Sequence, residues 1–191
     1  MTRPRRYDDD LRRRLLDVSS ETISHRGTQG LSLRAVAAGA GTTTAAVYAL
    51  FGSRDHLIEA VTAEGLARFA AHLDAVERTH DPGADLLALG VAYRASALND
   101  PHFYRVLFGS TSTAKPSEPE EHATFDALRQ AVRRLVGGPE PDVTEHTYRL
   151  WSVVHGLVDL ELGGLLPGTT TQRADRYIAT LRAVGPALLR G

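Results

Sequence analysis

Apolar residues recur every three or four positions along almost the whole chain, and this spacing constrains the fold more than any other feature. The strict alternation that marks a half-buried strand is nearly absent. Over residues 11–24, for example, Leu11, Leu15 and Val18 lie on one helical stripe, and Gly27 can end that helix. The sequence therefore predicts an all-α fold.

Capping residues and glycines divide the chain into about nine helices with no internal repeat. Pro186 is expected to kink or fray the last of them, because proline removes one helical hydrogen bond. Start signals are Ser32, Thr43, Ser53, Asp81-Pro82, Asp100-Pro101 and two capping-box spacings, Ser117 to Glu120 and Asp142 to Glu145. Expected helices include 33–39, 43–50, 142–163 and 171–184, and residues 109–120 are expected to form a polar loop.

The composition predicts a cytoplasmic protein. The chain has 191 residues, 42% of them hydrophobic and 24% charged, which is typical of globular domains. It has no cysteine, which fits a reducing compartment. The charged N-terminus has no apolar core of a signal peptide, and no apolar run is long enough for a membrane span.

Charge is unevenly distributed along the chain. Residues 1–54 carry nine arginines and five acidic residues, whereas the remaining residues carry 13 basic and 18 acidic residues. A basic segment joined to an acidic body favours binding of a polyanion at one end, although surfaces also segregate charge by chance.

The stretch GTTTAAVYALF, residues 41–51, has no charge and few bulky side chains. It follows the predicted helix 33–39 and a tight turn, so the two helices form a helix-turn-helix. Val47 and either Leu50 or Phe51 are expected to pack inward. A small, uncharged outer face lets the helix backbone approach closely in the DNA major groove, which is about 12 Å wide. The expected outer face consists of Thr43, Thr44, Ala45 and Tyr48.

This pattern resembles the N-terminal domain of the TetR family of bacterial transcriptional regulators. The matching residues are Gly27, the LSLRAVA segment from Leu31, Ala40-Gly41, Tyr48, Phe51, Ser53-Arg54 and Leu57. The resemblance implies a DNA-binding domain at residues 1–52, double-stranded DNA as partner, and Arg34 and Arg54 near backbone phosphates. It also implies groove-facing positions at Thr43, Thr44, Ala45, Ala46 and Tyr48. Thr42 departs from the apolar residue common at its position in the family.

The basic segment TRPRR, residues 2–6, is expected to precede the first helix as an arm. Two interpretations remain open. The arm can enter an adjacent minor groove, where narrow A·T-rich tracts attract arginine, or it can be a basic tail that adds only nonspecific affinity.

Residues 53–191 are expected to form a helical ligand-binding and dimerisation domain. The segment WSVVHGLVDLELGGLL from Trp151 resembles the Trp…His-Gly pattern of one TetR subgroup, in which the last two helices commonly form a four-helix dimer interface. The apolar band here is wider than one intramolecular contact needs, and Gly156 would permit close helix approach. Expected interface residues are Leu150, Val154, Leu157, Val158, Leu162, Ile178 and Leu181.

Aromatic residues gather in the second half of the chain and suit a small, mostly apolar effector, although each can equally be ordinary core. His155 has two interpretations, as a hydrogen-bonding ligand contact or as a packed histidine at a helix crossing. Expected ligand-binding residues are Tyr93, Phe103, Phe108, Phe125, Tyr148, Trp151 and His155. The resemblance implies a homodimer, usually a repressor, that a ligand releases from a near-palindromic site.

Two other classes of protein compete with a regulator. An enzyme is disfavoured because the sequence contains none of the common nucleophile, metalloprotease, phosphate-loop or dinucleotide motifs. We expect no cofactor and no metal site, since the histidines form no pair four residues apart, and His25, His56 and His72 are interpreted as surface residues. A helical interaction module that has lost DNA binding stays possible, because the predicted outer face has no Arg, Asn or Gln.

Overall fold

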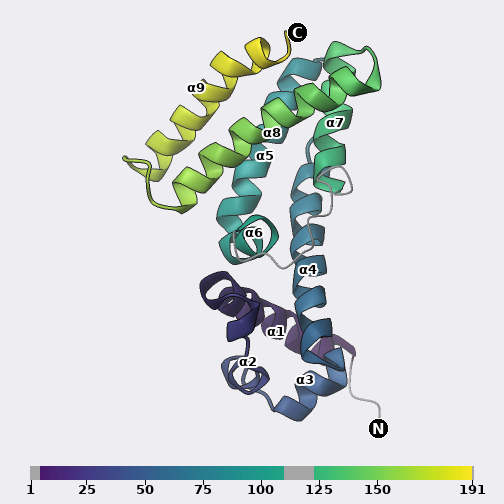
Figure 1. Cartoon of the computed structure of the whole chain (residues 1–191), viewed down its shortest axis with the longest axis vertical. Coiled ribbons are helices and arrows are strands. Elements are labelled where there is room, and N and C mark those ends of the chain that lie inside the picture. Colours follow the sequence, from purple (N-terminus) through teal and green to yellow (C-terminus); the bar gives the residue numbers. More distant parts are fainter. Residues whose placement is uncertain (1–4, 110–122, 191) are drawn as a thin grey trace. The chain divides into compact units, whose positions relative to one another are not determined.

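The computed structural model describes residues 5–109 and 123–190, and within them it confirms an all-helical fold of nine α-helices and one short 3-10 helix (Figure 1). No described helix has both the length and the apolar character needed to cross a membrane. The elements are α1 (Arg5–Arg26), η1 (Thr28–Gly30), α2 (Leu33–Gly39), α3 (Thr44–Phe51), α4 (Arg54–Asp74), α5 (Pro82–Asn99), α6 (Pro101–Phe108), α7 (Ala123–Val136), α8 (Glu140–Leu162) and α9 (Thr170–Leu188).

The helices form two compact units, which we call unit 1 and unit 2. Unit 1 contains the chain up to Ala67 and the segment that begins at Asp100, whereas unit 2 contains Arg68–Asn99 and α7 to α9. Helix α4 therefore contributes to both units, and α6 belongs with the N-terminal helices. This division differs from a single boundary between residues 52 and 53, which stays a prediction about functional domains.

Unit 1 is built on apolar side chains from five helices. Leu15 of α1, Val36 of α2, Val47 of α3 and Leu57 of α4 are fully buried in one cluster. Phe103 of α6 belongs to the same cluster. The apolar stripe predicted for the first helix is therefore confirmed, and α1 packs against α2 and α6.

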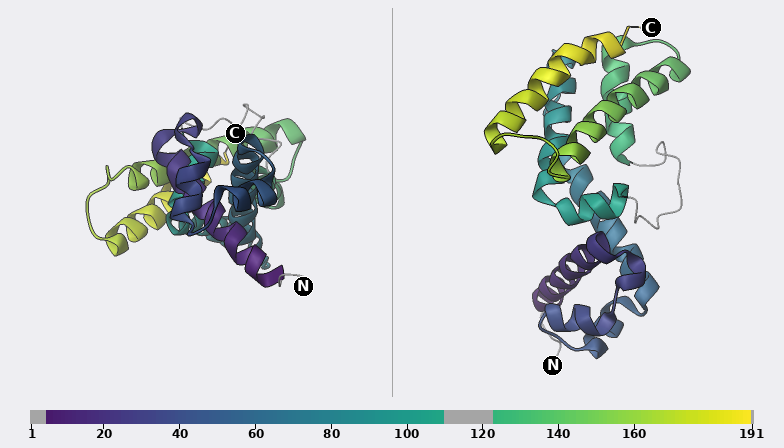
Figure 2. Two further views of the ribbon diagram at one scale, coloured as in Figure 1. Left: turned by 90° about the horizontal axis from the view of Figure 1, so that it is seen from below. Right: turned by 60° about the vertical axis from the view of Figure 1, so that its left-hand side comes forward.

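In unit 2, α9 runs back alongside α8, and both helices contact α5 (Figures 1 and 2). Hydrogen bonds between charged side chains with little exposure link these three helices. Glu161 on α8 accepts hydrogen bonds from Arg94 on α5 at 2.6 and 2.7 Å and from Arg173 on α9 at 3.2 Å. The hydroxyl of Tyr177 on α9 donates to the carbonyl of Gly90 on α5 at 2.8 Å.

Several predicted caps are confirmed. The Ser32 side chain accepts from the Ala35 amide, and the Ser53 hydroxyl accepts from the His56 amide at 3.1 Å. Asp81 accepts from the amides of Gly83 and Ala84 at 3.0 Å. Asp100 occupies the N-cap position of α6 but makes no side-chain capping bond there. The starts of α2, α4 and α5 therefore follow local chemistry.

Other boundaries differ from the predictions. Helix α1 already includes Arg5, so the expected arm is shorter, and its residues 2–4 lie outside the described residues, as do residues 110–120 of the polar loop and the Ser117 capping box. Helix α8 begins at Glu140 after Pro139, so Asp142 lies within its first turn and is not the N-cap.

The last helix also departs from expectation. A capping box between Thr169 and Gln172 starts α9, and the helix continues through Pro186 to Leu188. Because Pro186 lies in the final turn of α9, its missing amide N–H removes only one hydrogen bond, and that bond is near the C-terminal end of the helix. The proline therefore does not end the helix.

Candidate functional site

Local chemistry sets the geometry of the helix-turn-helix in unit 1. The Thr43 hydroxyl accepts from the Ala46 amide at 3.2 Å and so caps α3. Between the helices, Gly41 has a φ of 67°, a left-handed conformation that favours glycine over any residue with a Cβ. The Thr42 amide then donates to the Ala37 carbonyl at 2.9 Å, which closes the turn.

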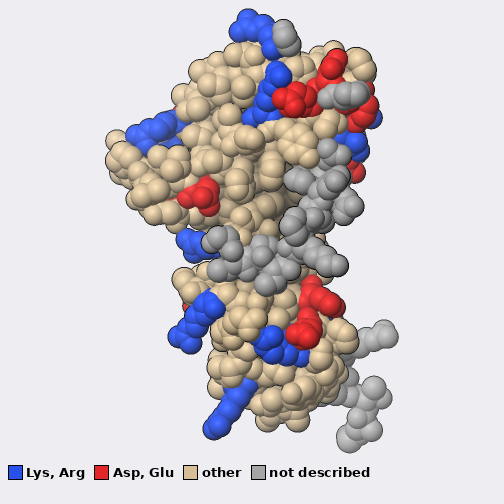
Figure 3. Space-filling model, in the orientation of Figure 1, with Lys and Arg blue, Asp and Glu red and all other residues tan. Residues whose placement is uncertain are grey.

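Helix α3 has one packed face and one exposed face, as the sequence predicts. Val47 and Phe51 are buried in the core of unit 1, whereas Tyr48 is 53% exposed and Ala45 is exposed. Thr43 is exposed and Thr44 half-buried, and the surface over α3 is uncharged in Figure 3. Ala46 differs from the other predicted groove positions, because it packs partly against the core. The exposed surface can fit a groove closely but offers no charged side chain for reading bases.

The two arginines expected at phosphates have different environments. Arg34 is exposed on α2, and its contact with a phosphate stays a prediction. Arg54 instead points its guanidinium at the main chain that precedes α2: Nε donates to the Leu31 carbonyl at 3.1 Å and Nη2 donates to the Thr28 carbonyl. A phosphate contact by Arg54 stays a prediction, whereas its bonds to these carbonyls give it a structural role that sequence reasoning missed.

We therefore expect Arg54→Ala to destabilise unit 1 by about 1.5–3 kcal/mol, because hydrogen bonds from a charged donor to two carbonyls are lost. Hydrogen exchange of the amides in residues 28–36 should accelerate. The matched control is Arg34→Ala, which should weaken DNA binding without changing exchange. Equal exchange in both variants would contradict the structural role.

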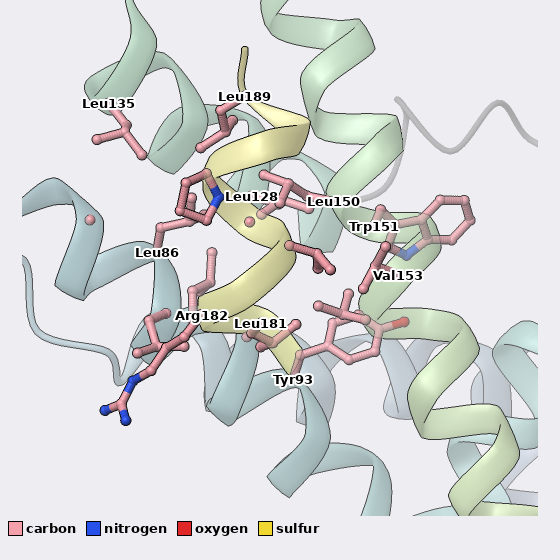
Figure 4. A pocket seen from close by; sticks show the side chains of 18 of the residues that line it. Leu86, Tyr93, Leu128, Leu135, Leu150, Trp151, Val153, Leu181, Arg182 and Leu189 are labelled. Carbon is pink, nitrogen blue, oxygen red and sulfur yellow. The ribbon is translucent and has the colours of Figure 1, made fainter. Parts of the chain in front are cut away.

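Unit 2 contains a cavity of about 250 Å³ between α5, α7, α8 and α9 (Figure 4). Its wall is mainly aliphatic, and Arg182 turns its guanidinium away from the leucines in the view of Figure 4. A wall of this kind suits an apolar molecule. The lining residues include Leu86, Leu89, Gly90, Tyr93, Leu128, Leu150, Trp151, Val154, Leu181, Val184 and Leu189.

Only two of the seven predicted ligand-binding residues, Tyr93 and Trp151, line this cavity. Phe125 is buried beside Trp151, with ring centroids 6.3 Å apart, and its ring is tilted against that of Tyr148 at 4.9 Å. Phe125 and Tyr148 do not line the cavity. The leucines were missed because aliphatic residues at helical spacing look the same whether they line a cavity or fill a core.

Phe103 and Phe108 both lie on α6, which belongs to unit 1, so a ligand contact by either residue stays a prediction. Phe103 is 4% exposed within the core of that unit. Phe108 packs its ring on Tyr104 at a centroid distance of 5.0 Å. Neither residue lines the cavity of unit 2.

His155 lies beside the cavity without lining it. Its Nδ1 is 3.1 Å from the Tyr93 hydroxyl, and its ring lies 5.3 Å from that of Trp151. Burial lowers the pKa of His155 below its ordinary value, and nearby Asp159 opposes that shift only in part. The contact between Nδ1 and the hydroxyl links His155 to Tyr93, which itself lines the cavity.

The predicted dimer residues divide into two sets. Leu150, Val154 and Val158 are at most 7% exposed within the single chain, and Leu150, Val154 and Leu181 line the cavity. Leu150, Val154 and Val158 therefore have little exposed area left for a partner, whereas Leu181 is half-buried, and the place of all four in a dimer interface stays a prediction. Leu157, Leu162 and Ile178 are half-buried and stay predicted interface residues.

Comparisons with known proteins agree with this architecture. A family model described as bacterial regulatory proteins, tetR family, matches residues 15–61, and one described as tetracyclin repressor-like, C-terminal domain, matches residues 86–184. HTH-type transcriptional regulator Rv1816 of Mycobacterium tuberculosis is 24% identical over 195 residues, which cover 82% of each protein.

Solved structures share the fold. A TetR-like transcriptional regulator from Rhodococcus sp. RHA1 has a TM-score of 0.74 at 18% identity, with 97% of this chain and 99% of that chain covered. The TetR family transcriptional regulator PfmR from Thermus thermophilus has a TM-score of 0.69 at 19% identity, with 93% and 98% covered.

An exposed third helix in a helix-turn-helix, joined to a second helical unit, defines a DNA-binding transcriptional regulator. The chain belongs to the TetR family of bacterial transcriptional regulators. The Trp…His-Gly subgroup that the sequence suggests stays a prediction.

Proposed function

We propose that the protein binds a near-palindromic operator as a homodimer, and that a small, mostly apolar effector releases it. The observation that carries the DNA contact is the exposed, uncharged face of α3, capped by Thr43. Helix N-termini favour phosphate, and threonine hydroxyl and methyl groups suit base edges and thymine methyl groups. Groove recognition by Thr44 and Tyr48 is part of this proposal.

Selection of bound DNA from a random pool tests the proposal directly. A dimer should select two half-sites about one helical turn apart, roughly 34–36 Å. Binding should weaken steeply with salt, because phosphate contacts release counterions. Weak, salt-insensitive binding with no selected sequence would instead support the helical interaction module.

The exposed apolar surface along α8 supports the dimer part of the proposal. Apart from its two chain neighbours and the nearby backbone of α8, no described atom lies within 4 Å of a Cβ placed on Gly156. Leu160 on α8 and Leu165 just after it are 42% and 70% exposed. The visible surface over α8 and α9 is largely uncharged (Figure 3). Such a patch is typical of surfaces that associate.

We expect Gly156→Glu to convert the dimer into a monomer, because it buries an unpaired charge at a site of close helix approach. Sedimentation velocity measures the change. Ala88→Glu, on an exposed part of α5, is the matched control and should remain dimeric. A dimeric Gly156→Glu protein would place the interface elsewhere.

The cavity of unit 2 supports the effector part of the proposal. A ligand that fills it would favour one arrangement of α5, α8 and α9, and a coupling of about 1–3 kcal/mol is typical of such regulation. Helix α4 is one covalent link through which this change would reach α3, since it belongs to both units. Tight ligand binding with unchanged operator affinity would refute the coupling. Repression is the proposed mode of control.

A further inference from the structure

Three potential metal ligands meet within unit 1, away from the exposed face of α3. Glu21 and His25 lie one turn apart on α1, and His102 lies at the start of α6. One donor atom from each residue lies within 4.8 Å of the other two. The rings of His25 and His102 meet edge to face, with centroids 5.2 Å apart. A search for histidine pairs in the sequence misses this group, because the i, i+4 pair joins a glutamate to a histidine.

A fourth residue, Ser24, orients His102. The Ser24 hydroxyl donates its single proton to the Glu21 carbonyl at 2.8 Å, and the same oxygen lies 2.9 Å from Nδ1 of His102. With that proton on the carbonyl, the Ser24 oxygen can accept a hydrogen bond from Nδ1–H of His102, and in this tautomer the lone pair of the ring is on Nε2. Histidine ligands of metals commonly donate their other ring N–H in this way.

The surroundings of His102 act on its pKa in opposite directions. Burial lowers the pKa of His102 below its ordinary value, Glu21 opposes that shift, and His25 and Arg105 add to it. The positive charge of Arg105 opposes a cation here, and the Glu21 carboxylate opposes that effect.

We propose that Glu21, His25 and His102 form a binding site for a divalent transition-metal ion such as Zn²⁺. Two imidazoles and one carboxylate are a ligand set that suits zinc, nickel or copper, whereas magnesium and calcium prefer oxygen ligands alone. Zinc ligands lie about 2.0–2.2 Å from the ion, so the three side chains must close in slightly. Glu21 and His25 are exposed, which gives them room to rotate and the ion a path from solvent.

A bound ion would join α1 to α6 inside the unit that carries the helix-turn-helix. The chain re-enters unit 1 at Asp100, two residues before His102, so the ion would fix the position of this re-entry against α1. This site is separate from the cavity of unit 2 and does not depend on the proposed operator or effector.

The test titrates Zn²⁺ into metal-free, tag-free full-length protein in competition with a chromophoric chelator. We expect one equivalent per chain with a dissociation constant in the micromolar range or tighter, and a melting temperature that rises to saturation. Mg²⁺ should give neither effect. His102→Ala and Glu21→Gln should each weaken binding by at least about tenfold, and Ser24→Ala by about 10- to 100-fold through loss of orientation.

His56→Ala is the matched control, because it removes an exposed histidine of α4 in the same unit and should leave Zn²⁺ affinity unchanged. Circular dichroism without metal shows whether each variant is folded. The proposal is overturned if the wild-type protein binds no Zn²⁺ in this range, or if His102→Ala binds it as tightly as His56→Ala does.

Discussion

Ala45→Glu should reduce affinity for the selected operator by at least about 100-fold, which corresponds to about 2.7 kcal/mol. Ala45 is exposed on the uncharged face of α3, where the backbone must come close to the DNA. A carboxylate there meets phosphate charge at short range, and juxtaposed like charges cost several kcal/mol. The longer side chain also holds the helix away from the groove. Fluorescence anisotropy with labelled operator measures the loss.

Ala63→Glu is the matched control for this prediction. It introduces the same charge at an exposed alanine in the part of α4 that belongs to unit 1. Its effect should be small and should fade with added salt, because exposed charges beyond about 10 Å are screened at 0.1 M salt. If both variants bind DNA equally well, α3 is not the helix that enters the groove.

Glu161→Ala should destabilise unit 2 by about 3–5 kcal/mol, the usual cost of removing one partner of a buried ion pair. The Glu161 side chain is 4% exposed and that of Arg94 13%, so the variant leaves a guanidinium in a protein interior. The loss also separates α8 from α5 and α9, which line the cavity. Trp151 is the single tryptophan of the chain, so its fluorescence during urea unfolding reports on unit 2.

The exposed pair of Glu145 and Arg149 on α8 provides the control. Glu145→Ala removes an i, i+4 ion pair whose side chains are 60% and 40% exposed, and should cost only about 0.3–0.5 kcal/mol. An equal midpoint shift in the two variants would show that the Glu161 network does not stabilise the unit.

The same network predicts how stability depends on pH. Hydrogen bonds from Arg94 lower the pKa of Glu161 most, and the charge of Arg94 and the hydrogen bond and charge of Arg173 lower it further. Together they hold this pKa below its ordinary value of 4.5, although burial opposes them. The network therefore contributes fully above pH 4.5 and is lost as pH falls through the lowered pKa. The stability difference between wild type and Glu161→Ala should shrink across that acid range.

The sequence predicted much of unit 1 because the signals there are local. Ser32 and Ser53 satisfy amides within the next helical turn, and Gly41 adopts a backbone conformation that its own lack of a side chain permits. The spacing of Val36 and Val47 identifies the buried faces of two short helices. Such features depend on residues within about a dozen positions of one another, so they can be inferred without tertiary structure.

Other assignments required tertiary structure, because they depend on residues far apart in the chain. Arg54 makes bonds to carbonyls more than 20 positions earlier, and Phe103 joins a core made by the first 61 residues. Aromatic residues were expected around a ligand, yet the cavity wall is mainly leucine and valine. An apolar stripe shows that a helix face is buried but does not identify its partner.

By itself, then, the sequence determined the helical class, the helix-turn-helix and the small exposed face of α3. Tertiary structure decided that α6 packs with α1, that one side of α8 lines a cavity, and that Glu21, His25 and His102 meet. The physical reason is that helix formation depends on neighbouring residues, whereas packing depends on which distant surfaces fit together.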